Sequence, residues 1–126
     1  MIGSTRKIRV WACPAPVDLR KGFDGLYGLA ANHLGLDPTS GDCFLFCNRW
    51  RTRAKVLFWD GTGLCLYMKR LESGRFACLW GGDQDQAVEL TMSELALFLE
   101  GSQVLGRVRL SPQILVLSPI DTAVAS

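Results

Sequence analysis

Three strand-like runs follow one another closely in the middle of the chain, and they constrain the fold more than any other feature. The runs are Cys43–Asn48, Ala54–Trp59 and Leu64–Arg70. Asp60-Gly-Thr-Gly63 joins the last two and is a short Gly-containing link typical of a hairpin. The order of these runs predicts an antiparallel meander.

The residues before the meander predict a strand and a helix. Residues 8–13 alternate weakly between apolar and polar side chains and end at prolines, which predicts a first strand. Asp18 is the expected N-cap of a helix over residues 19–34, where apolar residues recur at helical spacing. A stripe of glycines within this helix favours the close approach of another element: Gly22, Gly25 and Gly28.

The residues after the meander predict one more strand and a second helix. Residues 75–80 are a candidate fourth strand, and the polar residues 83–89 predict a loop. Thr91-Met-Ser-Glu94 fits a capping box that opens a short helix before Gly101. We therefore expect an α+β domain over residues 1–106, with a small antiparallel meander of three to four strands and two helices packed on one face. Residues 107–126 are expected to be a variable, partly disordered tail.

Composition narrows the class of protein. A hydrophobic share of 48% in 126 residues argues against disorder. No apolar run approaches the roughly 20 residues of a membrane span, and the N-terminus lacks an apolar signal region, so a soluble cytoplasmic protein is expected.

The cysteines predict neither disulfides nor a metal site. Their number is five, which is odd, and no secretion signal precedes them. Cys43 and Cys47 would lie about 13 Å apart along a strand, too far to share one zinc ion. The only histidine, His33, has no metal-ligand partner at helical spacing. We expect apolar thiols and neither a metal nor a cofactor.

Charge is unevenly distributed along the chain. Residues 1–80 carry 12 Lys+Arg against 6 Asp+Glu, a net charge of +6, whereas residues 81–126 carry 2 against 6, a net charge of −4. Cations occupy positions 49, 51, 53 and 55, and an extended chain would place all four on one side. Trp50, Trp59, Tyr67 and Trp80 lie among the basic strands. Cations bind phosphates and aromatic rings stack on unpaired bases, so this pattern favours nucleic acid, although edge strands also carry charge to prevent aggregation.

Catalytic interpretations have less support. Asp18, Asp60 and Glu72 could form an acidic triad for metal-dependent phosphoryl transfer, but a cap and a turn explain the first two. No nucleophile–base pair and no phosphate-binding Gly loop of the GxxxxGK type is present in the sequence. The sequence therefore predicts a protein that is not an enzyme.

Several segments together resemble the TnpB accessory proteins of bacterial insertion sequences of family 66, the product of the second reading frame. They are "VDLRKGFDGL" (17–26), "DPTSGDCFLFCNRWRTRAKVLFWDGTG" (37–63), "LYMKRLESGRF" (66–76) and "LTMSELALFLEG" (90–101). The resemblance implies a role in transposition beside a separate, larger transposase.

Two functional hypotheses follow. In the first, the chain is a noncatalytic accessory factor for transposition that contacts DNA phosphates, at nine positions: Arg49, Arg51, Arg53, Lys55, Lys69, Arg70, Arg75, Arg20 and Lys21. The last two are expected at the start of the first helix. In the second, the chain docks on the transposase through exposed Trp residues without binding DNA, since Trp and Arg also dominate protein interfaces.

Overall fold

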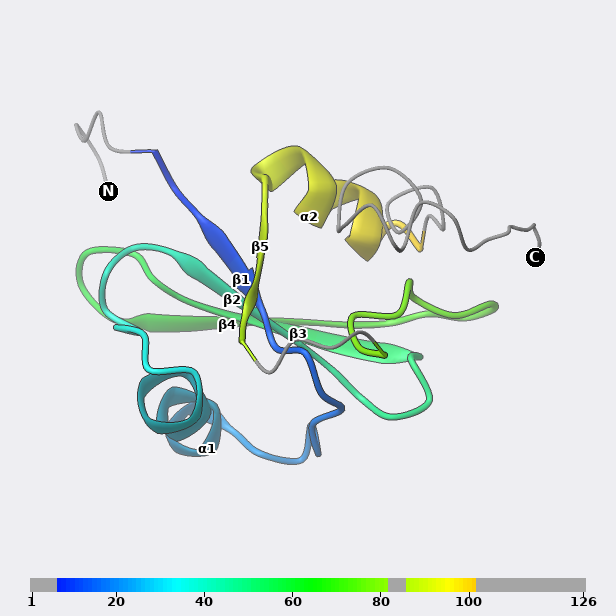
Figure 1. Ribbon diagram of the computed structural model, residues 1–126, viewed down its shortest axis with the longest axis horizontal. Coiled ribbons are helices and arrows are strands. Elements are labelled where there is room, and N and C mark those ends of the chain that lie inside the picture. The colour runs from blue at the N-terminus through cyan, green and yellow to red at the C-terminus, as the bar shows by residue number, and fades with distance from the viewer. Residues whose placement is uncertain (1–6, 82–85, 102–126) are drawn as a thin grey trace.

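A computed structural model of the protein describes residues 7–81 and 86–101. Its elements are, in chain order, β1 (Val10–Ala12), α1 (Phe23–Gly28), the π-helical segment η1 (Leu29–His33), β2 (Cys43–Cys47), β3 (Arg53–Trp59), β4 (Leu64–Arg70), β5 (Val88–Leu90) and α2 (Met92–Leu99). One sheet with separate helices confirms the predicted α+β class (Figure 1). The predicted tail, residues 107–126, lies outside the described residues.

The sheet has five strands in the order β4-β3-β2-β1-β5. The predicted meander is confirmed as β2, β3 and β4, which pair antiparallel. β1 pairs parallel to β2 and antiparallel to β5, so the sheet is mixed and larger than expected. Residues 75–80 are not a strand, and part of the predicted loop 83–89 belongs to β5 instead. β5 has only three residues, two of them buried against β1, so its apolar pattern is too short to stand out.

The first helix begins later than the sequence predicts. α1 begins at Phe23 with Gly22 as its N-cap, and no side chain caps it. Asp18 is therefore not the N-cap. Its carboxylate instead accepts a hydrogen bond from the backbone N–H of Arg20 at 3.0 Å. Asp side chains that bond nearby backbone groups in this way compete with helix formation.

The glycine stripe of this segment does not receive another element. A Cβ at Gly25 would lie 2.9 Å from the Cβ of Lys21, and one at Gly28 would lie 3.9 Å from the amide nitrogen of Asn32. A Cβ at Gly22 would meet nothing within 4 Å. The expected close approach is wrong, because among the described residues the atoms nearest to these Cβ positions belong to side chains of the same segment.

The second helix follows its local sequence closely. Thr91 accepts a hydrogen bond from the Glu94 backbone N–H at 3.1 Å, and the Glu94 carboxylate accepts one from the Thr91 backbone N–H at 2.7 Å. This capping box fixes the start of α2, and Gly101 follows its end with φ +83°, a conformation that favours glycine. Both limits of the predicted helix are confirmed.

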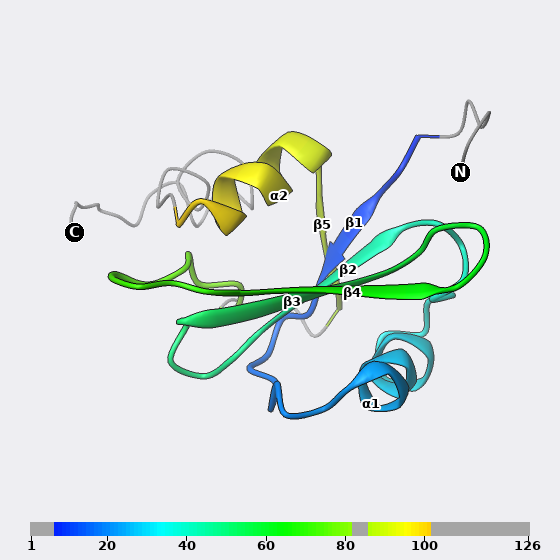
Figure 2. The same ribbon diagram turned by 180° about the vertical axis from the view of Figure 1, so that it is seen from behind.

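The two helices cover opposite faces of the sheet, and not one face as expected. Leu26 of α1 packs with Phe44 and Phe46 of β2, whereas Phe98 of α2 packs with Leu45 and Cys47 of the same strand. Figures 1 and 2 show α1 on one side of the sheet and α2 on the other. β2 is apolar at every position because it is covered on both faces, a pattern typical of central strands. Among the described residues, no helical segment is long and apolar enough to cross a lipid bilayer.

Candidate nucleic-acid interface

The cations at positions 49, 51, 53 and 55 do not share one face, because the chain is extended only from Arg53 onward. Residues 49–52 form the turn between β2 and β3. Asn48 organises this turn, since its Oδ1 accepts hydrogen bonds from the backbone N–H groups of Thr52 at 2.9 Å and Arg53 at 3.0 Å. An amide side chain that bonds nearby backbone groups favours a turn over a continued strand. The predicted row of four charges is therefore wrong.

Arg51 faces the core on the α2 side of the sheet. Its φ is +60°, in the left-handed region that few non-glycine residues adopt. Its Nη1 donates to the backbone carbonyl of Phe76 at 3.3 Å, and its own carbonyl accepts from the Phe76 N–H at 2.7 Å. Phe76 stacks on Phe98 of α2, with ring centroids 4.9 Å apart. Arg51 thus attaches the segment that follows β4 to the turn between β2 and β3.

Lys55 is buried and binds the protein itself. Its side chain lies on the α1 face of β3, and its Nζ donates to the backbone carbonyl of Lys21 at 3.0 Å. A buried ammonium requires such a partner, because transfer from water into the interior is costly. Lys55 therefore holds the segment before α1 against the sheet and is not accessible to a phosphate.

The cations of β4 and the following turn are divided between the two faces. Arg70 lies opposite Arg53 on the α1 face, and Lys69 lies opposite Ala54 on the α2 face. Arg70 also pairs with the exposed Glu72, at 3.4 Å. Arg75 follows the turn at Gly74 and is exposed.

In the segment before α1, the positive charge of Arg20 is paired with the carboxylate of Asp18. Arg20 and Lys21 precede α1 by one or more residues and do not lie at its first turn. The Arg20 guanidinium donates to both carboxylate oxygens of Asp18, with the shortest contact at 2.7 Å. These hydrogen bonds hold the pKa of Asp18 far below its usual range, and the two charges largely cancel.

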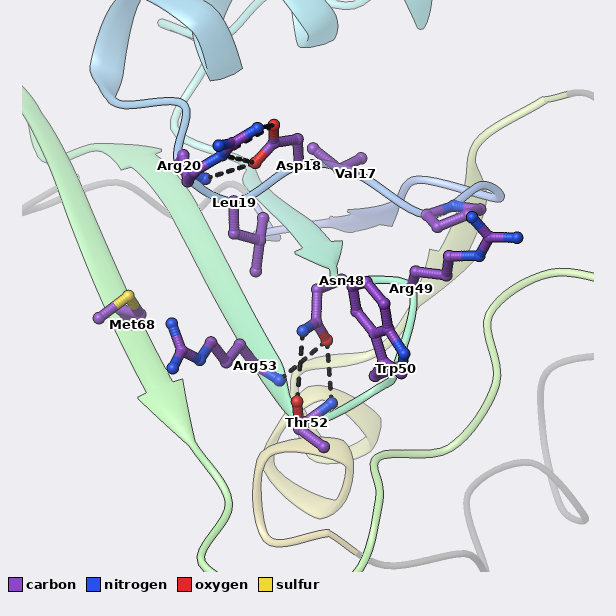
Figure 3. Close-up of a pocket in the computed structure, with 11 residues that line it drawn as sticks. Val17, Asp18, Leu19, Arg20, Asn48, Arg49, Trp50, Thr52, Arg53 and Met68 are labelled. Carbon is purple, nitrogen blue, oxygen red and sulfur yellow. Dashed lines mark hydrogen bonds and ion pairs between the residues drawn. The ribbon is translucent and has the colours of Figure 1, made fainter.

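One groove brings part of the predicted set together. Its volume is about 750 Å³, and it lies between the segment before α1 and the 48–53 turn (Figure 3). We call it the basic groove, and its lining residues are Pro16, Val17, Asp18, Leu19, Arg20, Asn48, Arg49, Trp50, Thr52, Arg53 and Met68. Three predicted cations lie here: Arg20, Arg49 and Arg53. The other six do not line it.

Two arginines of the basic groove are electrically uncompensated. In the part of the chain that the structure describes, no carboxylate pairs with Arg49 or Arg53. Arg53 also faces Arg70 across the β3–β4 pair, and like charges at directly opposite positions repel. Both arginines are exposed, and Figure 3 shows Arg53 extending toward Met68 while Arg49 extends the other way. The uncompensated positive charge of these two arginines favours an anionic ligand.

Two large apolar side chains that line the groove beside these arginines are exposed. Trp50 is 67% exposed at the tip of the turn, and Met68 is 56% exposed on β4. Met68, Asn48 and Thr52 were not predicted to be site residues. The sequence signal for a site at this turn was Trp50, because a tryptophan is normally mostly buried and this one stands among polar residues of a turn.

The acidic triad is not assembled. Asp60 and Glu72 flank the two ends of β4, and a seven-residue strand separates its ends by about 20 Å. Asp18 is engaged by Arg20. Among the described residues, no group of three His, Cys, Asp or Glu side chains could hold a metal ion.

All five cysteines are free. Burial raises the pKa of Cys47 to about 12 and also raises the pKa values of Cys13 and Cys43. These thiols therefore stay protonated at neutral pH and are poor nucleophiles.

Comparison with known proteins yields one family. The family model described as IS66 Orf2 like protein matches residues 8–108. The uncharacterized protein y4jC of Sinorhizobium fredii (strain NBRC 101917 / NGR234) is 37% identical over 101 residues, which cover 80% of this chain and 85% of that protein. The uncharacterized protein y4hO of the same strain is 35% identical over 101 residues, covering 80% and 86%. No solved structure gives a significant match.

Proposed function

This chain belongs to the IS66 Orf2-like family of insertion-sequence accessory proteins, and on that premise we propose that it assists transposition without catalysis by contacting DNA at the basic groove. The observation that carries the DNA contact is the pair of uncompensated arginines, Arg49 and Arg53, that line the groove. Arg20, held by Asp18, adds a donor group but little net charge. Phosphate contacts of this kind position a protein on DNA without reading its sequence.

The expected footprint is smaller than the full set of predicted cations. Lys55 is occupied by the Lys21 carbonyl, and Arg51 donates to the Phe76 carbonyl. Lys69 lies on the α2 face, away from the groove. Arg70 adjoins Arg53, and its longer contact with the exposed Glu72, at 3.4 Å, compensates its charge only in part. We therefore assign phosphate contact first to Arg49 and Arg53, and then to Arg70.

The test is fluorescence anisotropy of the protein on labelled DNA over a salt series. We expect the Arg49→Ala/Arg53→Ala double variant to bind more weakly and to lose about two from the slope of log K against log salt, since each phosphate contact contributes about 0.9. The matched control is Lys7→Ala/Arg9→Ala, which removes the same charge. Val10 pairs with Cys43 at the start of β2, so those two cations lie near the opposite end of that strand from the turn.

Two outcomes would contradict the proposal. One is an equal loss of affinity in the two double variants, which would indicate a response to net charge alone. The other is flat anisotropy for the wild-type protein at low salt. The second outcome would favour docking on the transposase, for which the exposed side chains of Trp50, Tyr67 and Met68 are the candidate contacts. Loss of transposase co-purification in Trp50→Ala would then identify that interface.

A further inference from the structure

We propose that the basic groove binds unpaired nucleotides, with a base stacked on Trp50 and its phosphates held by Arg49 and Arg53. This inference rests on the proposed function and specifies which form of nucleic acid the same site takes. Its basis is the combination, in one groove, of an exposed aromatic ring, an apolar wall and uncompensated cations.

The apolar wall suits an unpaired base better than the outside of an undistorted double helix. A paired duplex presents phosphates and sugars on its outside and keeps the faces of its bases stacked. Trp50 and Met68 are more than half exposed, and Leu19 and Val17 continue the apolar lining across the groove. An unpaired base can cover such a surface with its own face, and stacking on an aromatic ring tolerates any base.

The polar groups are arranged around this wall. Arg49 and Trp50 are neighbours in the turn, and Arg53 begins the strand that follows it. In Figure 3 the two guanidinium groups extend in different directions from the turn that carries the ring. A chain of nucleotides that passes over Trp50 could therefore meet a cation on each side of the stacked base. The Asn48 side chain is not counted among the ligand contacts, because its Oδ1 already accepts hydrogen bonds from the backbone N–H groups of Thr52 and Arg53.

The turn fixes the backbone that carries Trp50, and the ring takes no part in the core. Hydrogen bonds from Thr52 and Arg53 to Asn48 fix the backbone on one side of Trp50, and the Arg51 N–H donates to the Asn48 carbonyl at 3.0 Å. The ring itself is exposed and belongs to neither core cluster. Its replacement should therefore leave the fold intact and report on ligand binding alone.

The experiment compares labelled oligodeoxyuridylate, oligouridylate and a DNA duplex at one low salt concentration. We expect single strands to bind more tightly than the duplex. Trp50→Ala should weaken single-strand binding by about 5- to 150-fold, which corresponds to the roughly 1–3 kcal/mol of one base stack. Trp50→Phe should restore most of the affinity because it keeps a stacking face.

The matched control is Tyr67→Ala. Tyr67 is an exposed aromatic residue that lies opposite Val56, on the α2 face of the sheet. Its replacement should leave single-strand binding unchanged. Circular dichroism of each variant confirms that the fold is kept. A preference for oligodeoxyuridylate over oligouridylate, or the reverse, identifies DNA or RNA as the source of the unpaired nucleotides, because the two strands differ only in the 2′-hydroxyl.

The outcomes separate this inference from the proposed function. Duplex binding as tight as single-strand binding, with no effect of Trp50→Ala, would overturn the inference while the proposed DNA contact stands. Absence of binding to all three nucleic acids at low salt would overturn both. An equal loss of affinity in Trp50→Ala and Tyr67→Ala would also overturn the assignment of stacking to the basic groove.

Discussion

The two hairpin turns of the sheet use the same device, but only the first carries cations. In the turn between β2 and β3, Asn48 Oδ1 accepts from the backbone of Thr52 and Arg53. In the turn between β3 and β4, Asp60 Oδ1 accepts from the backbone N–H groups of Thr62 at 2.9 Å and Gly63 at 3.0 Å. One side-chain oxygen thus closes each turn. The neutral amide leaves neighbouring arginines uncompensated, whereas a carboxylate there would partly neutralise them.

Each turn has one residue with a positive φ angle, and the two turns place different residue types there. Gly61 occupies this position in the second turn, with φ +106°, and Arg51 occupies it in the first, with φ +60°. Glycine adopts such angles without strain, and arginine does not. Arg51 nevertheless contributes a contact that glycine could not make, because its guanidinium donates to the Phe76 carbonyl. The second turn only reverses the chain, while the first also carries side chains with other contacts.

Removal of the side-chain oxygen that closes the first turn should have the largest effect on stability. Asn48→Ala removes an acceptor for two backbone N–H groups, and we expect it to lower the free energy of unfolding by about 1–3 kcal/mol. Urea denaturation measures the change. Asn48→Asp is the matched control, since a carboxylate can accept the same two hydrogen bonds and should keep most of the stability. An equal destabilisation by both substitutions would show that the Oδ1 contacts are unimportant.

Substitution of the residues with positive φ angles, Gly61 and Arg51, should have an intermediate effect on stability. Gly61→Ala forces a side chain into a strained conformation and should lower the free energy of unfolding by about 1–2 kcal/mol. Arg51→Gly should change stability less, because release of strain offsets the lost contact with Phe76. Thermal or urea unfolding of the two variants tests this order. A larger loss in Arg51→Gly would mean that the Phe76 contact outweighs the strain.

The response to pH should be the smallest difference between the turns. Hydrogen bonds from the backbone of Thr62 and Gly63 lower the pKa of Asp60 from 3.8 to about 2. A carboxyl group with a lowered pKa stabilises the fold above its unfolded pKa, and this contribution is lost as pH falls through the folded value. Asp60→Asn should therefore lose stability relative to the wild type at pH 5, and the gap should narrow toward pH 2. Asn48 does not titrate, so Asn48→Ala should show a gap that is independent of pH. Urea midpoints across this range provide the measurement, and a constant gap for Asp60→Asn would contradict it.

Local sequence predicts those parts of the fold that local contacts determine. The three central strands, the Asp60–Gly63 turn and the Thr91 capping box all depend on residues close in the chain, and the structure confirms them. β5 and the parallel pairing of β1 with β2 depend on partners far away in the sequence, and they were not predicted. The burial of β2 on both faces was not predicted either, although no position of Cys43-Phe-Leu-Phe-Cys47 is polar.

The basic groove could be predicted only in part. A period of two suggested that positions 49 to 55 form one charged face, but it could not show that Asn48 would close a turn within them. Pro16–Arg20 and Met68 join the groove from segments distant in sequence, and no local pattern connects them. The hydrogen bond from Lys55 to the Lys21 carbonyl is likewise a tertiary contact, which explains why its burial was missed.

The position of β1 in the sheet has a consequence for folding kinetics. β2, β3 and β4 pair through short connections, whereas β5 pairs only with β1 among the described strands, with Val10 opposite Leu90. Contacts between residues so distant in sequence form slowly. β1 must therefore wait for β5 to be synthesised before the α2 side of the core closes. Until then Leu45 and Val56 lack the cover that Phe98 gives them, and this exposed surface makes the half-formed sheet the stage at which aggregation competes with folding.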